Sequence, residues 1–434
     1  MTGRTIRAAQ LPLAALTVLF AVAAAPARLE AASTASTGIP GRILEPEGVI
    51  DCATGFPPAN GGHDLAAELA AVLSQVPQAT VRCARQTIDC AGDGIQNHDF
   101  FSAVIWLPHP SGTILSFSGA RGAGFHSENV AEYVEGRFRV ALIAYAMSSM
   151  RDTWACPLSN CPDYLTAGDP GPRAAGCRPA TVIAYFKNQF QMGAFCAQGH
   201  SAGSSQLAYA MSHYNLGEAF DYVQLTGWTP FAKPGCGCDP SNWPSTCPDE
   251  GNDGMREYAE NPPEFQIEAI DRPFYYAAMP GAGGQNFLTL VGDAFGLHSG
   301  DECRALNAAP ISQAAFAHLT SNGIVSSGAD YYYGATVMDL YACADQKSVV
   351  DGNGSWYLEK IAGANPGHIF VETIPWAAED PDCSLEDVWN DPDGGPSPLR
   401  QKTIDRMLGQ CVDHGDAGWL VDDNGLARLQ GDGN

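Results

Sequence analysis

Residues 193–214 narrow the choice of fold more than any other segment of the chain. A short apolar run from Gly193 to Ala197 leads into Gly199-His200-Ser201-Ala202-Gly203, and Ser204 to Tyr214 then has the apolar spacing of a helix. This order predicts a buried strand that turns sharply into a helix, with Ser201 at the turn. Glycines on both sides of the serine permit such a turn, because larger side chains would collide where strand and helix meet.

The rest of the chain predicts strands that alternate with helices. The expected helices span His63–Leu73, Ala180–Phe190 and Gln313–Thr320, and the expected strands span Phe100–Leu107, Thr113–Phe117, Phe138–Tyr145, Tyr222–Leu225 and Val337–Ala342. Continuous apolar strands of this kind predict an α/β fold, with a mostly parallel central sheet flanked by helices. Residues 228–300 are rich in Pro, Gly, Asp and Cys and contain no clear strand. They are therefore expected to form a disulfide-rich insertion, in the position of a lid or cap.

The first 27 residues have the layout of a secretory signal peptide. Arg4 and Arg7 precede the apolar stretch Leu11 to Ala25, and small residues follow at Ala25-Pro26-Ala27. This stretch is short for a membrane span, so we expect cleavage, a secreted or periplasmic product and no stable membrane anchor; an uncleaved N-terminal anchor is the alternative. The predicted organisation is a linker over 28–48, a catalytic domain over 49–412 and an acidic tail over 413–434.

Fourteen cysteines, spread from Cys52 to Cys411, predict a disulfide framework of up to about seven bridges in an exported protein. The closely spaced pairs Cys83/Cys90, Cys156/Cys161 and Cys236/Cys238 suggest stapled loops, although connectivity cannot be read from the sequence. A zinc site at Cys236, Cys238 and Cys247 is the rival interpretation. It is disfavoured because paired C-x₂-C spacing and histidine partners are missing. We expect neither a metal nor an organic cofactor.

The net charge of −25 disfavours two classes of partner. A strongly acidic surface repels nucleic acid and anionic membranes. It does not identify a substrate, and the sequence leaves the oligomeric state open.

Residues 100–371 resemble the α/β-hydrolase superfamily. The resemblance rests on the Gly199–Gly203 motif, the strand and glycine segment before it, and Gly367-His368 near the C-terminal end. Within that superfamily the chain resembles exported esterases of the feruloyl esterase and polyhydroxyalkanoate depolymerase kind. The resemblance implies that Ser201 is a nucleophile, followed along the chain by an acid and then a histidine.

Five histidines follow Ser201, and His368 is the preferred general base. His213 and His318 lie in expected helices, His298 ends the irregular insertion, and His414 belongs to the polar tail. His368 follows Asn365-Pro366-Gly367, which we interpret as a flexible loop after the last strand.

Asp345 is the preferred acid because it ends the apolar run that begins at Thr336. It would hold the imidazole in its working tautomer and stabilise the imidazolium. Asp293, which also follows an apolar run, is the main alternative, and Asp339 is expected to be buried in mid-strand away from the site.

The oxyanion hole is expected to use the backbone N–H of Ala202 and one from the glycine-rich segment Ser118–Gly124. Ala120 is preferred there over Arg121, although the His-Gly-Gly sequence common in the family is absent. A phosphate-binding interpretation of these glycines is disfavoured, because the Lys-Ser/Thr ending is missing.

Together these residues predict acyl transfer to water, with a small-molecule or polymeric carboxylic ester as substrate. A serine peptidase or lipase of the same fold, or a non-catalytic binding protein on this scaffold, are the alternatives.

Overall fold

Every residue described here belongs to the unit Ser33–Asn434. The computed structural model describes residues 38–146, 171–226, 317–342, 355–365, 371–375, 398–412, 419–421 and 427–429, apart from residues 39, 45–47, 61, 96, 120–121, 191, 201, 319 and 335. The expected signal peptide, most of the linker, the insertion over 228–300 and most of the acidic tail lie outside these ranges. Their boundaries stay predictions.

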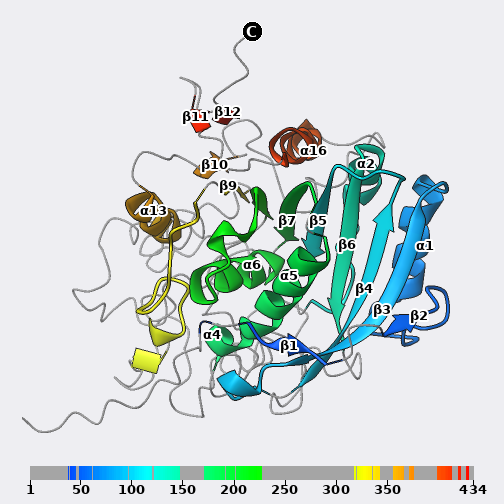
Figure 1. The fold of residues 1–434 in the computed structure, drawn as a ribbon, viewed down its shortest axis with the longest axis horizontal. Helices are drawn as coiled ribbons and strands as arrows, with labels where there is room; N and C mark the ends of the chain where they lie inside the picture. Colours follow the sequence, from blue (N-terminus) through cyan, green and yellow to red (C-terminus); the bar gives the residue numbers. More distant parts are fainter. Residues whose placement is uncertain are drawn as a thin grey trace, which may run out of the picture. The chain divides into compact units, whose positions relative to one another are not determined.

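Ten of the described strands form one sheet, which runs in the order β1-β3-β4-β6-β5-β7-β8-β9-β10, with β2 also paired to β3 (Figure 1). From β6 through β5, β7, β8 and β9 to β10, each strand is parallel to the next, whereas the pairs β1–β3, β2–β3, β3–β4 and β4–β6 at the other end are antiparallel. Their bounds are β1 Arg42–Ile43, β2 Val49–Ile50, β3 Thr80–Asp89, β4 His98–Trp106, β5 Gly112–Phe117, β6 Phe138–Tyr145, β7 Ala194–His200, β8 Tyr222–Thr226, β9 Val337–Ala342 and β10 Val371–Pro375. A separate pair consists of β11 Trp419–Val421 and β12 Ala427–Leu429.

Both faces of the sheet are buried, because successive side chains of a strand point to opposite faces. In β5, Leu115 and Phe117 enter one hydrophobic core while Ile114 enters the other. In β6, Ile143 and Leu142 divide in the same way. The central strands therefore consist mainly of apolar residues, and this is why they could be predicted from the sequence.

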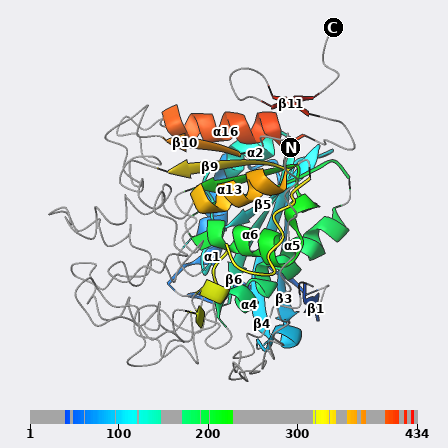
Figure 2. The same cartoon turned by 90° about the vertical axis from the view of Figure 1, so that its left-hand side faces the viewer.

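Helices cover each face. Residues of α5 (Cys177–Gln189) and α6 (Ala202–His213) form part of one core, whereas residues of α1 (Leu65–Gln75), α2 (Val130–Glu135) and α16 (Pro398–Gln410) belong to the other. Figures 1 and 2 show α5 and α6 side by side over the sheet. The remaining described α-helices are α4 (Pro172–Ala175) and α13 (Ser355–Ala364). The predicted α/β fold class, with a mostly parallel central sheet flanked by helices, is confirmed.

Helix α1 shows how local sequence sets these elements. The Asp64 side chain accepts a hydrogen bond from Ala67 N at 3.0 Å and so caps the helix, while Leu65, Leu69 and Val72 recur on one buried face.

Three disulfides join described residues: Cys52–Cys83, Cys90–Cys177 and Cys196–Cys411. The suggestion that Cys83 and Cys90 close a loop together is wrong. Cys83 belongs to strand β3 and Cys90 follows its end, so about 20 Å of extended backbone separates them, whereas a disulfide needs Cα atoms within about 7 Å. The other suggested pairs, Cys156/Cys161 and Cys236/Cys238, lie outside the described residues. Disulfides of this kind are typical of oxidising compartments.

Helix α16 is tied to the sheet by a buried ion pair as well as by the Cys196–Cys411 bridge. Arg406 donates from Nε and Nη2 to the two carboxylate oxygens of Asp339 at 2.8 and 2.7 Å, and Tyr222 donates its hydroxyl to the same carboxylate at 2.6 Å.

No helix within the described ranges combines the length and the apolar character needed to cross a membrane.

Candidate active site

The strand–turn–helix unit predicted around Ser201 is present on both sides of that residue. Strand β7 ends at His200 and helix α6 begins at Ala202, so Ser201, itself outside the described residues, is the single residue between them. A Cβ at Gly199 would lie 2.6 Å from the backbone of Gly203, and one at Gly203 would lie 2.2 Å from Phe117 O. Both glycines are therefore required by the close approach of strand and helix.

Two hydroxyl groups fix the carboxyl ends of β7 and β8. Ser204 donates its hydroxyl to Gly199 O at 2.8 Å and to Thr226 O at 3.1 Å, and Thr226 donates its own to Gly199 O at 3.2 Å. These hydrogen bonds fix the backbone of Gly199, before the turn, to Ser204 on the helix and to Thr226 on the neighbouring strand. Because α6 starts at Ala202, the positive end of its dipole lies at the turn that carries Ser201.

The glycine-rich segment after β5 runs beside this turn, since Phe117 of β5 pairs with Gly199 of β7. Asn60 donates to Ala123 O at 2.6 Å and to Tyr145 O at 2.7 Å, and Phe125 N donates to the Glu68 carboxylate at 2.8 Å. Gln206 Nε2 donates to Ser118 O at 3.3 Å, and Tyr145 N donates to Gly122 O at 2.7 Å. The segment is therefore held at both ends, although Ala120 and Arg121 lie outside the described residues.

The preferred acid, Asp345, and its alternative, Asp293, also lie outside the described residues. Strand β9 ends at Ala342, three residues before Asp345, and pairs in parallel with β8. Its carboxyl end therefore lies at the same edge of the sheet as His200 and Thr226. Asp339 is fully buried in mid-strand, as expected, and its carboxylate serves the ion pair with Arg406.

His368 differs from its expected setting, a loop after the last strand of the sheet. Strand β10 begins at Val371, after His368, and Val371 pairs with Met338 near the start of β9. Because β9 and β10 are parallel, the chain enters β10 at the amino edge of the sheet. Ser201 follows the opposite, carboxyl edge. His368 itself lies outside the described residues, so its role stays a prediction.

The other histidines after Ser201 divide into packed and undescribed ones. His213 is buried in helix α6, its ring stacks on Tyr209 and its Nε2 lies 3.1 Å from Gly323 O, so it is a packing residue. His318 is half-buried in a helical turn and contacts Asn322. His298 and His414 lie outside the described residues.

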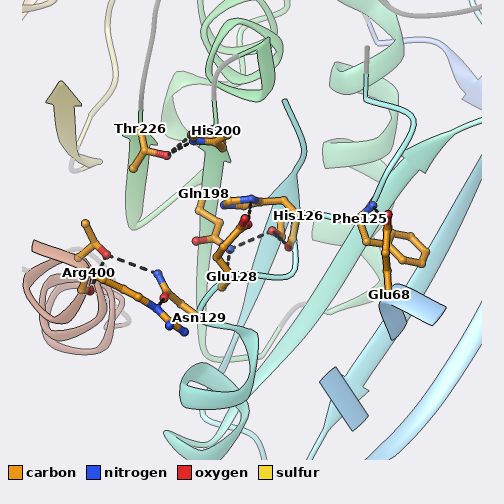
Figure 3. A network of polar contacts seen from close by, with 12 residues as sticks. Glu68, Phe125, His126, Glu128, Asn129, Gln198, His200, Thr226 and Arg400 are labelled. Atoms are coloured by element: carbon orange, nitrogen blue, oxygen red, sulfur yellow. Dashed lines mark hydrogen bonds and ion pairs between the residues drawn. The ribbon is translucent and has the colours of Figure 1, made fainter. Parts of the chain in front are cut away.

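A polar cluster that the sequence did not predict adjoins the turn. His126 Nδ1 forms an ion pair with Glu128 Oε2, and the His126 ring lies parallel to that of His200, with centroids 5.4 Å apart. His200 Nδ1 is 3.3 Å from Thr226 Oγ1 on its other side. Figure 3 shows these residues meeting from three segments, namely the loop after β5, the end of β7 and the end of β8. We call His126, Glu128 and His200 the imidazole cluster.

The electrostatics of the imidazole cluster follow from burial and from its charges. Burial raises the pKa of Glu128, but the charges of His126 and His200 and the hydrogen bond from His126 together outweigh it and bring the pKa to about 2. Burial lowers the pKa of His200 to about 4, with His126 adding to this effect and Glu128 opposing it. Near neutral pH Glu128 is therefore ionised and His200 neutral.

The backbone around the imidazole cluster is held independently of its carboxylate. Ser116 donates its hydroxyl to His126 O at 2.8 Å, and Gln198 Nε2 lies 3.4 Å from Glu128 O. Arg400 donates to the side chain of Asn129 at 2.7 Å. The Glu128 side chain is 40% exposed while that of His126 is only 4% exposed. The carboxylate is thus not needed to keep this loop in place.

The imidazole cluster was not predicted, because the order nucleophile, acid, histidine directs attention to the histidines that follow Ser201. His126 and Glu128 come long before the serine, and the pairing of β5 with β7 brings them to it. The usable signal was a histidine and a carboxylate two residues apart, directly after the glycine-rich segment.

Comparison with protein-family models gives no match, and neither does comparison with curated protein sequences. Among solved structures, a lipase in its open form is 14% identical, with a TM-score of 0.38, over 72% of this chain and 95% of that one. A carboxyl esterase from Bacillus coagulans is 13% identical, with a TM-score of 0.39, over 73% and 95%. The chain also matches the Glycosylation Associate Protein (Gap123) complex of Streptococcus agalactiae at 13% identity and a TM-score of 0.35, over 64% of this chain but only 40% of that one. Likenesses this distant do not assign an activity.

Proposed function

We propose that this chain is an exported serine hydrolase that cleaves small-molecule or polymeric carboxylic esters through an acyl-enzyme on Ser201. The observation that carries the proposal is the packing of Gly199 and Gly203 on either side of Ser201, where any Cβ would collide with backbone atoms. In a turn that tolerates only glycine at both positions, Ser201 is the residue between the end of a parallel strand and the start of a helix. This is the arrangement in which a serine acts as a nucleophile.

The proposed reaction runs in two halves. Ser201 Oγ attacks the ester carbonyl while a general base takes its proton, the alcohol leaves with a proton, and water then releases the acid from the serine. The oxyanion would be stabilised by the backbone N–H of Ala202, at the start of α6, and by that of Ala120 in the anchored segment after β5. From the sequence, His368 is the base and Asp345 the acid that orients it.

The test uses the mature chain, refolded or expressed under oxidising conditions, and a fluorophosphonate probe together with p-nitrophenyl acetate. Ser201→Ala should abolish both labelling and turnover. Ser205→Ala is the matched control, because Ser205 lies one turn along α6, is buried, and its Oγ has no hydrogen-bond partner among the described residues. It should label and turn over like the parent.

A folded parent chain that takes up no probe would overturn the proposal and leave a binding protein on a hydrolase scaffold. Labelling that persists in Ser201→Ala would assign the reaction to another nucleophile. Turnover of peptides in preference to esters would move the substrate class to that of a peptidase.

A further inference from the structure

The loop before helix α1 and the first turn of that helix lie against the glycine-rich segment that follows β5. Four side chains from this part of the chain contact three consecutive residues of the segment, 123–125. We call these four side chains the clamp: Phe56, Asn60, His63 and Glu68. A glycine-rich backbone has many accessible conformations, so contacts of this kind decide which one it adopts.

We propose that Asn60 and Glu68 are positioning residues, which hold the glycine-rich segment in the geometry that its oxyanion donor needs. This inference rests on the proposed function, which places one oxyanion donor, Ala120, in that segment. Neither Asn60 nor Glu68 would touch the substrate, and both would act through the backbone of the segment.

Asn60 is fully buried and donates twice from its amide. Nδ2 donates to Ala123 O at 2.6 Å and to Tyr145 O at 2.7 Å, so one side chain ties the segment to the end of strand β6. A side-chain amide suits this position, because both partners are carbonyl oxygens and need donors. The segment therefore gives up a buried hydrogen bond if it moves away from Asn60.

Glu68 reaches the same segment two residues further along. One of its carboxylate oxygens accepts from Phe125 N at 2.8 Å (Figure 3), and the other lies 2.7 Å from Nδ1 of His63. The His63 ring lies against Gly124, where an added Cβ would overlap it. Phe56 packs edge-to-face on Phe125, with 5.6 Å between the ring centroids. Hydrogen bonds and packing therefore act together on this short stretch of backbone.

The clamped stretch continues directly into a closed turn. Gly122 N donates to Gly119 O at 2.9 Å, and Gly122 O accepts from Tyr145 N at 2.7 Å. Gly122 has a φ of +72°, a conformation that favours glycine. The proposed donor, Ala120, lies between the two glycines in the sequence. Tyr145 anchors both the turn, through its N, and Asn60, through its O, so the turn and the clamp share one support.

The other side of the turn is attached to helix α6. Ser118 O accepts from Gln206 Nε2 at 3.3 Å, and an added Cβ at Gly203 would lie 3.0 Å from Ser118 O. Gly203 and Gln206 belong to the first turns of α6, which begins directly after Ser201. Loss of the clamp would release one side of the turn only. The expected result is a shift of the segment in a protein that still folds.

Such a shift should affect the transition state more than the bound substrate. An oxyanion donor forms its hydrogen bond with the oxygen of the tetrahedral intermediate, and its removal costs about 100- to 1000-fold in kcat. A displaced donor stabilises that oxygen less, although the substrate binds as before. We therefore expect kcat to fall while KM changes little.

The deciding experiment compares Asn60→Ala with Asn322→Ala in the full mature chain. Asn322 is the matched control, because it is also a buried asparagine whose Nδ2 donates to a backbone carbonyl, that of His318, but its contact with α6 is at Tyr209, in the second half of that helix. We expect Asn60→Ala to lower kcat for p-nitrophenyl acetate by about 10- to 100-fold, with KM within about threefold of the parent. Asn322→Ala should keep the kcat of the parent. Circular dichroism and urea unfolding establish that each variant is folded.

A trifluoromethyl ketone inhibitor supplies a readout that a purely structural role would not move. Its adduct with Ser201 carries the oxyanion, so its inhibition constant should rise in Asn60→Ala by the factor by which kcat/KM falls. An unchanged kcat in folded Asn60→Ala overturns the inference. An equal loss in Asn322→Ala, or a loss that appears in KM alone, also overturns it.

Glu68→Ala and Glu68→Gln cover the case in which Asn60→Ala does not fold. Glu68 is partly exposed in the first turn of α1, and both replacements are good helix formers, so these variants should fold. Glu68→Ala removes the acceptor of Phe125 N and should lower kcat by about 10-fold. Glu68→Gln keeps an acceptor oxygen and should recover most of that loss. A kcat of Glu68→Ala equal to that of the parent overturns the inference.

These outcomes separate from those of the proposed function. A parent that Ser201→Ala inactivates, with Asn60→Ala and Glu68→Ala fully active, refutes the positioning role and keeps the serine hydrolase. A folded parent that never labels with the fluorophosphonate probe refutes both.

Discussion

Gly203 lies directly against the carbonyl oxygen of Phe117, so close that a Cβ would stand 2.2 Å from that oxygen. The contact joins helix α6 to strand β5 at the level of Ser201, where the glycine-rich segment begins. Any residue larger than glycine must push the helix away from the sheet.

Gly203→Ala should therefore reduce kcat/KM by about 100-fold or more, because a shift of about 1 Å at the nucleophile suffices for a loss of that size. It should also cost about 1–3 kcal/mol of unfolding free energy, as overpacking does. Gly409→Ala, in helix α16, is the control: nothing lies within 4 Å of the added Cβ, and it should stabilise the protein by up to about 1 kcal/mol. Steady-state kinetics and urea unfolding check both. Equal effects of the two changes would contradict the packing argument.

Asp339→Asn should lower the unfolding free energy by about 3–5 kcal/mol, because the charge of Arg406 would be left unbalanced in a largely buried site. The double variant Asp339→Asn/Arg406→Met should recover part of this loss. Since Asp339 serves the structure, kcat of the folded protein should stay within about twofold of the parent. A selective loss of kcat at unchanged stability would instead make Asp339 the acid of the reaction.

Replacing Cys196 and Cys411 together by alanine should lower the unfolding free energy by about 5 kcal/mol, since the bridge closes a loop with a sequence separation of 215. The matching change at Cys52 and Cys83, with a separation of 31, should cost roughly 1.5 kcal/mol less. Guanidinium unfolding of the two double variants measures the difference. A larger loss at Cys52 and Cys83 would show that local packing, and not loop length, sets the contribution.

The unfolding free energy should fall as the pH is lowered from about 6.5 toward 4. Burial lowers the pKa of His200 to about 4 and that of His213 to about 3, whereas both have a value near 6.5 when unfolded. Between these values the unfolded chain binds more protons, so stability rises with pH and is lost on acidification. For His213 this amounts to about 3 kcal/mol at pH 4.5.

His213→Phe should give a shallower pH dependence over the same range, although it also loses the hydrogen bond to Gly323 O. Thermal unfolding at pH 7.5 and pH 4.5 checks this, with Tyr332→Phe as an exposed control that keeps the slope of the parent. His63 works in the opposite direction, since its hydrogen bond with Glu68 raises its pKa, but it is half-exposed and its effect should be small. A slope unchanged by His213→Phe would contradict the assignment.

The sheet could be predicted where burial on both faces leaves an unbroken apolar run. The expected strand Phe138–Tyr145 coincides with β6, and the expected strand Val337–Ala342 coincides with β9. Strand β3 escaped prediction, because Thr80–Asp89 lies in the antiparallel part of the sheet and alternates buried with accessible side chains, several of them polar or charged. Its pattern therefore lacks the apolar run that marks the central strands.

Helix α16 was missed for a different reason. Its polar residues are ones that a sequence pattern assigns to solvent, yet Arg400 and Arg406 find partners on α2 and β9, and Thr403 accepts from Asn129. Tertiary pairing of this kind has no local signature. The same holds at the candidate active site. The Gly199–Gly203 motif could be recognised from the sequence, whereas the imidazole cluster could not be predicted, because it forms only when β5 and β7 pair.

The bridge between Cys196 and Cys411 also turns most of the C-terminal half of the chain into a covalent ring. Ser201, Asp345 and His368 all belong to that ring, as do residues 228–300. A protease that cuts once inside it leaves two polypeptides that stay linked, and they separate on a denaturing gel only after a thiol is added. A nick in such a ring therefore leaves the three predicted catalytic residues covalently attached to the rest of the chain.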